Sequence, residues 1–358
     1  MMHRTALLPI FPQAAHSEGP LVIAGPCSAE SEEQTLSTAR QLAEAGVRIF
    51  RAGVWKPRSK PGSFEGRGAE ALGWLRMVKR STGMLVTTEV ATPRHLELAL
   101  EAGIDGVWIG ARTAANPFAV QEIADALAAL PEENKESLTV MVKNPVNPDL
   151  ELWIGAIERI YLAGVKRLAA IHRGFSSYGP HLYRNEPRWA IPIELLRRIP
   201  GLPMIFDPSH IAGRSDLVPQ LARQAMDMDY YGLMIETHCN PREALSDAEQ
   251  QLTVAQLKDL LKTLYKRTGS TRTESLEQLR NKIDGLDDRL LEILAERMDV
   301  SREIGEFKRL HNMPVVQYAR YNDLMERRVA QAEKLGLSPA FIRSLLAVIH
   351  EESVRQQV

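Results

Sequence analysis

Four side chains of metal-binding type lie at or soon after the carboxyl ends of predicted strands: Cys27, His210, Glu236 and Asp247. A thiolate, an imidazole and two carboxylates form a donor set that suits a divalent transition metal such as Mn²⁺, Fe²⁺, Co²⁺ or Zn²⁺, whereas structural zinc sites are usually richer in cysteine. Taken singly, Cys27 could be a buried core thiol and His210 a core histidine. Cys239 follows Glu236 by three residues, so a Cys27–Cys239 disulfide under oxidation is a further alternative. Together the four residues predict a divalent metal site.

Six cations also occupy the ends of predicted strands. They are Arg51, Lys56, Arg58, Arg112, Lys143 and Arg173. Because like charges repel one another, such a cluster is stable only with anions bound in it, and arginine forks bind carboxylate and phosphate through paired hydrogen bonds. The cluster predicts a small ligand with several negative charges. Taken one at a time, each cation could instead be a solvated loop residue.

The elements that would position these residues are eight short apolar runs that alternate with helical patterns. The runs span residues 21–25, 47–53, 85–90, 106–110, 138–143, 165–174, 203–210 and 232–238. This alternation predicts an α/β protein with a (β/α)8 TIM barrel in residues 1–264, whose strand ends share one mouth. A doubly wound open sheet is the alternative, but the chain has no GxGxxG turn to support it.

The pattern changes after the barrel. A polar segment, residues 265–272, predicts a linker, and residues 273–358 predict a smaller all-α domain. Its apolar positions step by three and four, and no proline interrupts residues 273–310. The two shorter helices expected near 318–335 and 339–357 cannot cover so long a rod. We therefore expect an intertwined homodimer or a larger homo-oligomer.

Polar residues enter the apolar stripes of these helices. Arg297 continues the stripe of the long helix, and Lys308 returns to nearly the same face eleven residues later. Arg280 points elsewhere, so a partner helix would have to bring it across. Ser353 and Gln357 extend the stripe of the last helix. These positions suggest a buried polar ligand, and a coiled-coil dimer with surface arginines is the alternative.

Composition excludes several classes of partner. The net charge of −1 offers no field for nucleic acid or for acidic membranes. No apolar run approaches the roughly 18 residues of a membrane span, and prolines break the short apolar stretch near the start, which argues against a signal peptide. Two cysteines make no disulfide framework. We expect a cytoplasmic enzyme with small-molecule substrates.

The segments "GPCS", "RAGVWKPRS", "GART", "KNP", "HRG", "DPSH" and "IETH…ALSD" resemble the signature set of 3-deoxy-D-arabino-heptulosonate 7-phosphate (DAHP) synthase, over about residues 20–262. The resemblance implies condensation of phosphoenolpyruvate with erythrose 4-phosphate in the shikimate pathway. It implies that the four donor residues hold one metal ion, Mn²⁺ first. It also implies that phosphoenolpyruvate is held by Arg51, Lys56, Arg112, Lys143 and Arg173. Arg58 and Ser59 would hold the phosphate of erythrose 4-phosphate, although many relatives have threonine at position 59. Lys56 is a candidate proton donor.

The related synthase that uses arabinose 5-phosphate shares this barrel and is the substrate-level alternative. The "KPRS" element argues against it.

The segment "LRNKIDGLDDRLLEILAERMDVSREIGEFK" resembles the first helix of the all-helical chorismate mutases, in a match that runs from about 274 to 357. The resemblance implies a Claisen rearrangement of chorismate to prephenate. It places Arg280, Arg297, Lys308, Arg320, Ser353 and Gln357 on ligand positions, with Arg297, Lys308 and Gln357 as catalytic residues. Gln317 and Tyr321 stand where many members have acidic residues.

These observations predict a bifunctional enzyme of aromatic amino acid biosynthesis. One alternative is a synthase whose helical segment is a non-catalytic dimerisation and ligand-sensing module. A non-enzymatic metal-binding scaffold fits poorly with six cations. Because chorismate and prephenate lie downstream of the barrel's reaction, we expect an allosteric enzyme in which prephenate is an inhibitor.

Overall fold

The computed structural model describes residues 7–14, 19–56, 62–179, 181–264 and 274–357. The chain divides into two compact units, Met1–Thr268 and Gly269–Val358, and each is described by itself. The linker predicted at residues 265–272 lies outside the described residues, so its bounds stay a prediction.

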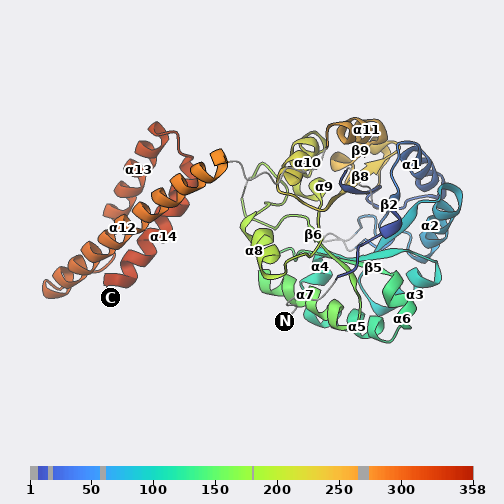
Figure 1. Cartoon of the computed structure of the whole chain (residues 1–358), viewed down its shortest axis with the longest axis horizontal. Coiled ribbons are helices and arrows are strands. Elements are labelled where there is room, and N and C mark those ends of the chain that lie inside the picture. Colours follow the sequence, from blue (N-terminus) through green and yellow to red (C-terminus); the bar gives the residue numbers. More distant parts are fainter. Residues whose placement is uncertain (1–6, 15–18, 57–61, 180, 265–273, 358) are drawn as a thin grey trace. The chain divides into compact units, whose positions relative to one another are not determined.

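The first unit is a closed barrel of parallel strands, ringed by helices (Figure 1). The barrel strands are β1 (Leu21–Gly25), β2 (Ile49–Arg51), β3 (Leu85–Val90), β4 (Gly106–Ile109), β5 (Thr139–Lys143), β6 (Arg167–His172), β7 (Met204–Phe206) and β8 (Gly232–His238). Each strand pairs with the next, and β1 pairs with β8 with Gly25 opposite Glu236. The prediction of a (β/α)8 barrel is confirmed, and the open-sheet alternative is wrong because the β1–β8 pairing closes the sheet. A short ninth strand, β9 (Leu252–Thr253), pairs with the end of β8.

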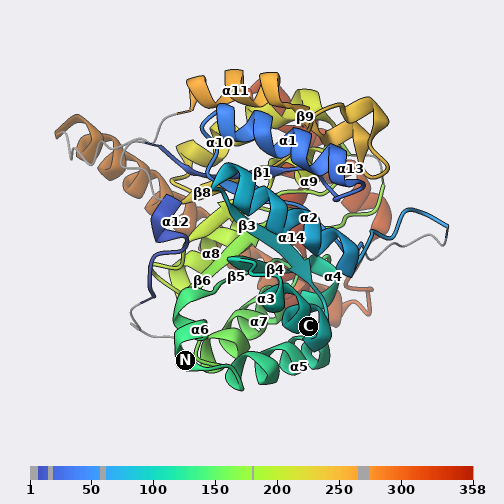
Figure 2. The ribbon, with the colours of Figure 1, turned by 90° about the vertical axis from the view of Figure 1, so that its right-hand side faces the viewer.

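Helices connect the strands. They are α1 (Glu32–Glu44), α2 (Ala69–Thr82), α3 (Pro93–Glu101), α4 (Ala111–Ala114), α5 (Pro117–Ala128), α6 (Glu132–Ser137), α7 (Leu150–Leu162), α8 (Ala190–Arg198), α9 (Pro208–Ala212), α10 (Val218–Asp227) and α11 (Val254–Thr263). Side-chain caps explain several starts: Ser31, Thr92 and Asp149 each accept a hydrogen bond from an amide of the first turn. Figure 2 shows α1 and α2 side by side on the outside of the barrel.

The barrel is filled by two apolar layers. One layer lies between the strands and the surrounding helices. The other fills the interior, where Ile23, Trp108 and Met234 are fully buried and the N-terminal residues Ile10 and Phe11 join the same cluster. Because the interior is packed with apolar side chains, polar groups concentrate at the carboxyl ends of the strands.

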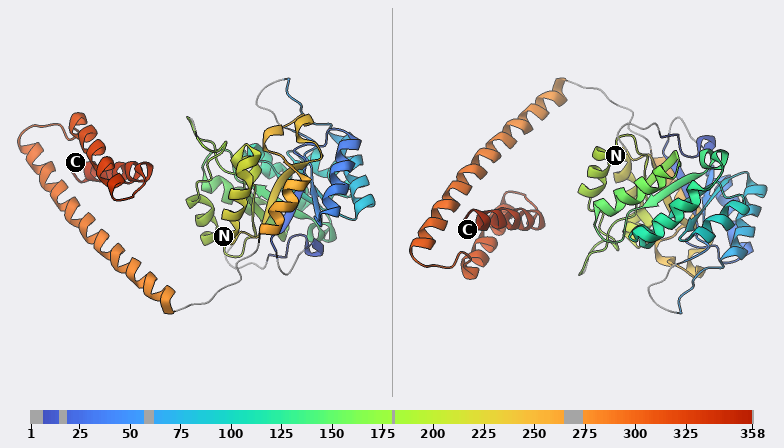
Figure 3. Two further views of the ribbon diagram at one scale, coloured as in Figure 1. Left: turned by 90° about the horizontal axis from the view of Figure 1, so that it is seen from above. Right: turned by 90° about the horizontal axis from the view of Figure 1, so that it is seen from below.

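The second unit consists of three helices: α12 (Glu274–Leu310), α13 (Tyr318–Lys334) and α14 (Pro339–Gln357). Both views of Figure 3 show α12 as one unbroken rod. The α14 helix packs against both α12 and α13, and Val329, Ala332 and Ile342 form a small buried cluster. The prediction of an all-helical region is confirmed. No helix in the described part of the chain is long and apolar enough to cross a membrane.

Candidate functional site

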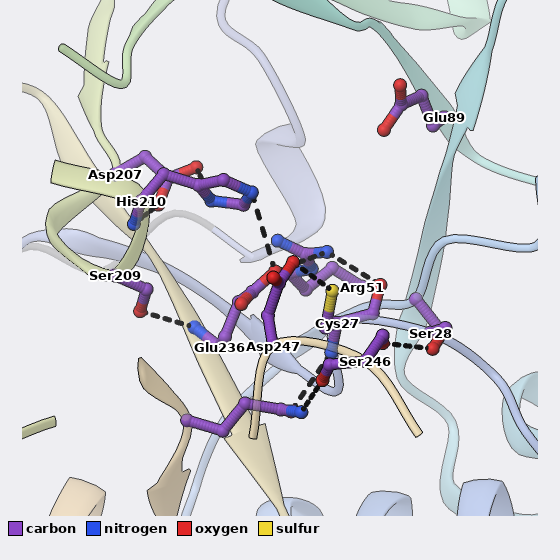
Figure 4. A network of polar contacts seen from close by, with 12 residues as sticks. Cys27, Ser28, Arg51, Glu89, Asp207, Ser209, His210, Glu236, Ser246 and Asp247 are labelled. Carbon is purple, nitrogen blue, oxygen red and sulfur yellow. Dashed lines mark hydrogen bonds and ion pairs between the residues drawn. The ribbon is translucent and has the colours of Figure 1, made fainter. Parts of the chain in front are cut away.

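The four predicted metal donors converge at the mouth of the barrel (Figure 4). One ligand atom each from Cys27, Glu236 and Asp247 lies within 4.8 Å of the others, and the Cys27 Sγ is 3.3 Å from Asp247 Oδ2. His210 Nε2 lies 3.7 Å from Glu236 Oε1. His210 lies on the short helix α9 rather than on a strand, because β7 ends at Phe206 and Pro208 begins the helix.

The local backbone explains how Cys27 reaches this point. Gly25 ends β1 with φ +151°, and a Cβ added there would lie 2.0 Å from the carbonyl oxygen of Arg51. Only glycine permits this close approach of the two chains. The chain then bends at Cys27, whose amide donates to Gln251 Oε1 at 3.0 Å. The thiol is therefore held inside the mouth, fully buried.

The residues present fit a divalent metal. Glu236 Oε1 is buried and accepts no hydrogen bond from any described residue, while its other oxygen accepts one from Gln250 Nε2 at 2.6 Å. His210 Nδ1 lies 2.8 Å from Asp207 Oδ2, which leaves Nε2 directed at the other donors. A carboxylate behind a histidine is the usual arrangement around a ligating imidazole. A buried carboxylate oxygen that accepts no hydrogen bond, within a mixed donor set, is available to bind a cation.

Electrostatics agree with this assignment. Burial, followed by the charge of Glu236, raises the pKa of the Cys27 thiol to about 12, so a bound cation would be needed to keep it as thiolate. Burial lowers the pKa of His210, which keeps the imidazole neutral and able to ligate. Burial alone would raise the pKa of Asp247, yet its electrostatic interactions with His210 and Arg184 hold the pKa well below its ordinary value.

Two of the predicted cations adjoin these donors. Arg51 Nη2 lies 3.2 Å from the Cys27 carbonyl oxygen and 3.3 Å from Glu236 Oε1. Lys56 Nζ donates to the same carbonyl at 3.1 Å. Burial alone would lower the pKa of Lys56, but Cys27 and Glu89 raise it above its ordinary value, so the side chain remains an ammonium ion.

Lys143 and Arg173 lie at the carboxyl ends of their strands, and Arg112 lies in the short helix α4 that follows β4. Lys143 ends β5 and forms a buried ion pair with Asp207 at 2.9 Å. Arg173 follows β6 and donates to Asn185 Oδ1 at 2.8 Å. Burial, together with the charges of Arg184 and Arg112, lowers the pKa of Arg173 to about 10 although Asp207 opposes the shift. Clustered positive charge of this kind favours an anionic ligand. Arg58 and Ser59 lie outside the described residues.

Several supporting residues were not predicted from the sequence. Asp207 stands inside the "DPSH" segment and directly follows β7, so its place after a strand was a usable signal. Glu89, at the end of β3, accepts from Trp108 Nε1 at 3.1 Å. Gln250 ends a short 3-10 helix, Ala248–Gln250, and Asn185 lies in the loop between β6 and α8, and no local pattern marks either residue. Their contacts arise only from the tertiary fold.

The disulfide alternative for Cys27 finds no support. Both cysteines are free. Cys239 Sγ lies 3.9 Å from the Gln34 carbonyl oxygen and 3.9 Å from His238 Nδ1, whereas Cys27 Sγ contacts Asp247.

A second group of predicted residues meets between α12 and α14. Arg297 Nη1 hydrogen-bonds Ser353 Oγ, and Lys308 Nζ donates to Gln357 Oε1 at 2.8 Å. Burial lowers the pKa of Arg297. These four side chains form a cationic site with neutral hydrogen-bonding groups.

The remaining residues of that prediction lie apart from the group. Arg280 pairs with Glu277 at 3.0 Å, and Arg320 pairs with Asp323 at 3.5 Å, with both arginines more than half exposed. Gln317 is the exposed N-cap residue of α13. The Tyr321 ring lies 4.4 Å from the ring of His350.

Comparison with known proteins assigns both units. Residues 14–273 match the DAHP synthetase I family. The chain belongs to the DAHP synthetase I family. Residues 279–358 match the family model for chorismate mutase type II. Both resemblances are confirmed, and the two family domains make the chain a bifunctional DAHP synthase and chorismate mutase.

Relatives of the DAHP synthase domain include a phospho-2-dehydro-3-deoxyheptonate aldolase of Thermotoga maritima, 33% identical over 245 residues that cover 68% of this chain and 69% of the relative. A 2-dehydro-3-deoxyphosphooctonate aldolase of Acidithiobacillus ferrooxidans is 27% identical over 267 residues, 68% of this chain and 87% of that protein.

Two solved structures resemble this chain. A crystal structure of the Thermotoga maritima DAHP synthase matches with a TM-score of 0.59 and 32% identity, covering 67% of this chain and 66% of that one. A truncated form of the Thermotoga maritima enzyme matches with a TM-score of 0.57 and 29% identity, covering 73% of this chain and 87% of that one.

Proposed function

We propose that the barrel condenses phosphoenolpyruvate with erythrose 4-phosphate at a divalent metal held by the four donor residues. The observation that carries the proposal is the adjacency of donors and cations: Arg51 Nη2 lies 3.3 Å from Glu236 Oε1, and Arg51 and Lys56 both contact the Cys27 carbonyl oxygen. An anion bound by these cations lies beside the metal ligands.

The metal donors and the cations have different proposed roles. A bound divalent ion, Mn²⁺ in our proposal with Co²⁺, Fe²⁺ and Zn²⁺ as alternatives, supplies Lewis-acid polarisation of the aldehyde oxygen. Arg51, Arg112, Lys143 and Arg173 bind the carboxylate and phosphate of phosphoenolpyruvate and direct its C3 to the aldehyde carbon. Arg58 and Ser59 bind the phosphate of erythrose 4-phosphate.

Lys56 is the proposed proton donor. The carbon–carbon bond forms between C3 of phosphoenolpyruvate and the aldehyde carbon, and the aldehyde oxygen takes a proton from the Lys56 ammonium group. Water then adds to C2, and one of its protons restores the Lys56 ammonium group. The bond between C2 and the phosphate oxygen breaks, so that phosphate leaves with the second proton and C2 becomes the ketone carbon. The raised pKa of Lys56 keeps the required proton in place at neutral pH.

The helical domain converts chorismate to prephenate by a Claisen rearrangement, and we propose the roles of its residues as follows. Arg297, Arg320 and a partner's copy of Arg280 bind the two carboxylates, and Ser353 hydrogen-bonds the substrate. Lys308 and Gln357 stabilise the negative charge that grows on the ether oxygen. The 2.8 Å contact between Lys308 and Gln357 supports their joint action.

A homodimer through α12 is part of this proposal. The side chains of Leu279, Ile283, Leu286, Leu290 and Ile293 repeat along α12 and are each 49–57% exposed. An apolar stripe of this length is characteristic of an interface. A second copy of the chain would cover it and bring Arg280 to the partner's site.

One assay separates the alternatives for both domains. Phosphoenolpyruvate loss is followed with erythrose 4-phosphate or arabinose 5-phosphate, with and without a chelator, and chorismate loss is followed in the same samples. We expect turnover with erythrose 4-phosphate only, abolished by the chelator, and chorismate turnover that the chelator leaves intact. A helical domain that binds chorismate without consuming it would instead be the sensing module.

Variants of two donor residues, with Cys239→Ser as the matched control, test the metal assignment. Cys27→Ser and His210→Ala should each lose bound metal and condensation activity, while Cys239→Ser retains both because its thiol does not face the donors. Full metal occupancy in Cys27→Ser would return Cys27 to the role of a buried core thiol.

A further inference from the structure

The loop between β6 and α8 carries a dipeptide, Arg184–Asn185, that lies against the metal-donor helix α9. The Asn185 amide donates to the Ile211 carbonyl oxygen at 3.2 Å, and Phe175 and Glu186 exchange two backbone hydrogen bonds of 2.8 and 2.9 Å. Backbone hydrogen bonds on both sides therefore hold the dipeptide in place, independently of its side-chain contacts.

Asn185 joins the two halves of the barrel site. Its Nδ2 donates to the His210 carbonyl oxygen at 2.6 Å, and its Oδ1 accepts from Arg173 Nη1 at 2.8 Å. A carbonyl oxygen only accepts and a guanidinium only donates, so the amide has one orientation that satisfies both neighbours. The side chain is 7% exposed, which makes both contacts costly to lose.

Arg184 reaches the metal donors that Asn185 does not. Its Nη1 lies 3.1 Å from Asp247 Oδ1 and 2.9 Å from Gln250 Oε1. Gln250 is almost fully buried and donates through Nε2 to Glu236 Oε2 at 2.6 Å. The Gln250 side chain therefore links Arg184 to a second metal donor, Glu236.

Close packing holds the dipeptide in this position. A Cβ added to Gly174 would lie 2.8 Å from the Asn185 carbonyl oxygen, and one added to Gly213 would lie 2.4 Å from the Arg184 Cβ. Both glycines have positive φ angles of 78° and 70°. The backbone at Gly174 and Gly213 approaches the dipeptide as closely as glycine allows. Because no free space is left around it, a movement of Arg173 displaces Asn185 and the residues that Asn185 contacts.

We propose that Arg184 and Asn185 are positioning residues that couple phosphoenolpyruvate binding to metal binding. The inference rests on the proposed roles of Arg173 and of the metal donors. When an anion draws the Arg173 guanidinium into place, Asn185 fixes the backbone of His210, and Arg184 fixes Asp247 and, through Gln250, Glu236. Each ligand therefore raises the affinity for the other by the same factor.

The test measures that factor directly. Mn²⁺ affinity of the full chain is determined by competition with a chromophoric chelator, with and without saturating phosphoenolpyruvate, after correction for Mn²⁺ bound by free phosphoenolpyruvate. We expect phosphoenolpyruvate to raise the Mn²⁺ affinity of the unaltered protein about tenfold, within the usual range of coupling between sites. In Asn185→Ala the factor should fall to about one.

Two further variants locate the coupling. Asn185→Asp keeps the volume and the contact with Arg173 but cannot donate to the His210 carbonyl oxygen, so it too should lose the coupling. Arg184→Ala should weaken Mn²⁺ binding even without phosphoenolpyruvate, because Asp247 and Gln250 both lose a partner. Arg214→Ala, which removes an exposed arginine paired with Asp216, is the matched control and should behave as the unaltered chain.

The outcomes are distinct. Protein that binds no Mn²⁺ would contradict the proposed function itself. Protein that binds Mn²⁺ with no effect of phosphoenolpyruvate, or folded Asn185→Ala and Asn185→Asp variants that keep the full factor, would overturn the coupling while leaving the metal site in place. Tryptophan fluorescence verifies that each variant is folded, since all five tryptophans belong to residues 55–189 of the barrel.

Discussion

Lys143 and Asp207 form a buried ion pair at the barrel mouth, with Nζ 2.9 Å from Oδ2. The same carboxylate oxygen lies 2.8 Å from His210 Nδ1. Burial alone would raise the pKa of Asp207, but His210 and Lys143 hold it well below its ordinary value. One carboxylate therefore orients a proposed metal donor and balances a proposed phosphoenolpyruvate-binding cation.

Asp207→Asn should weaken both functions of this carboxylate. Neutralising it leaves Lys143 as a buried cation without its partner, which should lower the free energy of unfolding by about 3 kcal/mol. The metal affinity should fall about 10- to 100-fold because His210 loses the group behind its Nδ1. Chelator competition measures the affinity, and denaturant unfolding followed by tryptophan fluorescence measures the stability.

Asp216→Asn is the control for that variant. Its ion pair with Arg214 is 59–60% exposed, so its loss should change the stability by less than about 1 kcal/mol. Equal losses of stability in the two variants would mean that the buried ion pair of Asp207 contributes no more than the exposed ion pair of Asp216.

The sequence predicted the barrel because each strand is a compact apolar run, as at residues 85–90 and 232–238, and because a helix of suitable length separates each pair. It predicted His210 at a strand end, but Pro208 starts a helix two residues earlier. Asn185 could not be predicted from the sequence, because its role depends on two contacts with residues 12 and 25 positions away. Local pattern specifies elements, whereas loop side chains acquire roles only when the barrel closes.

His172 should make the barrel sensitive to acid. Burial lowers its pKa to about 3, and the neutral ring is held by Tyr230 at 3.0 Å and the Pro187 carbonyl oxygen at 2.7 Å. An unfolded histidine titrates near pH ~6.5, so between pH 6.5 and 3 the unfolded chain binds the extra proton. The stabilisation is complete above about pH 6.5 and is lost as the pH falls toward 3.

We expect this one group to lower the free energy of unfolding by up to about 1.4 kcal/mol per pH unit in that window. His172→Gln should remove that part of the slope, whereas His181→Gln, at a partly exposed histidine, should retain it. Tryptophan fluorescence during urea unfolding at pH 4.5 to 7.5 gives the comparison. Parallel slopes for His172→Gln and the unaltered chain would contradict the assignment.

A mutase site shared between two copies predicts complementation. Arg280→Ala and Arg297→Ala should each lose chorismate turnover. If Arg280 reaches the partner's site, co-refolding equal amounts of the two variants creates mixed dimers with one intact site and one doubly altered site. About one quarter of the full activity should then return, since half of the dimers are mixed.

The condensation activity is the internal control in that experiment, because neither arginine belongs to the barrel. Mixtures that stay inactive although light scattering confirms mixed dimers would place Arg280 and Arg297 in the site of one chain or exclude Arg280 from it.

Prephenate inhibition is the last prediction and concerns why the two domains share one chain. The mutase reaction lies several steps after the condensation and receives no intermediate directly from it, so channelling explains the fusion poorly. The substrate and product of the mutase reaction instead lie downstream of the barrel's own product, so they suit a feedback signal. If prephenate favours one arrangement of the chain over another, it inhibits the condensation when that arrangement binds the barrel's substrates less tightly. We expect saturating prephenate to slow phosphoenolpyruvate consumption by the intact chain, and cleavage within residues 265–272 to abolish the effect while both activities remain. Condensation rates that do not change in saturating prephenate or chorismate would contradict this prediction. The fusion would then serve only dimerisation or the joint expression of the two domains.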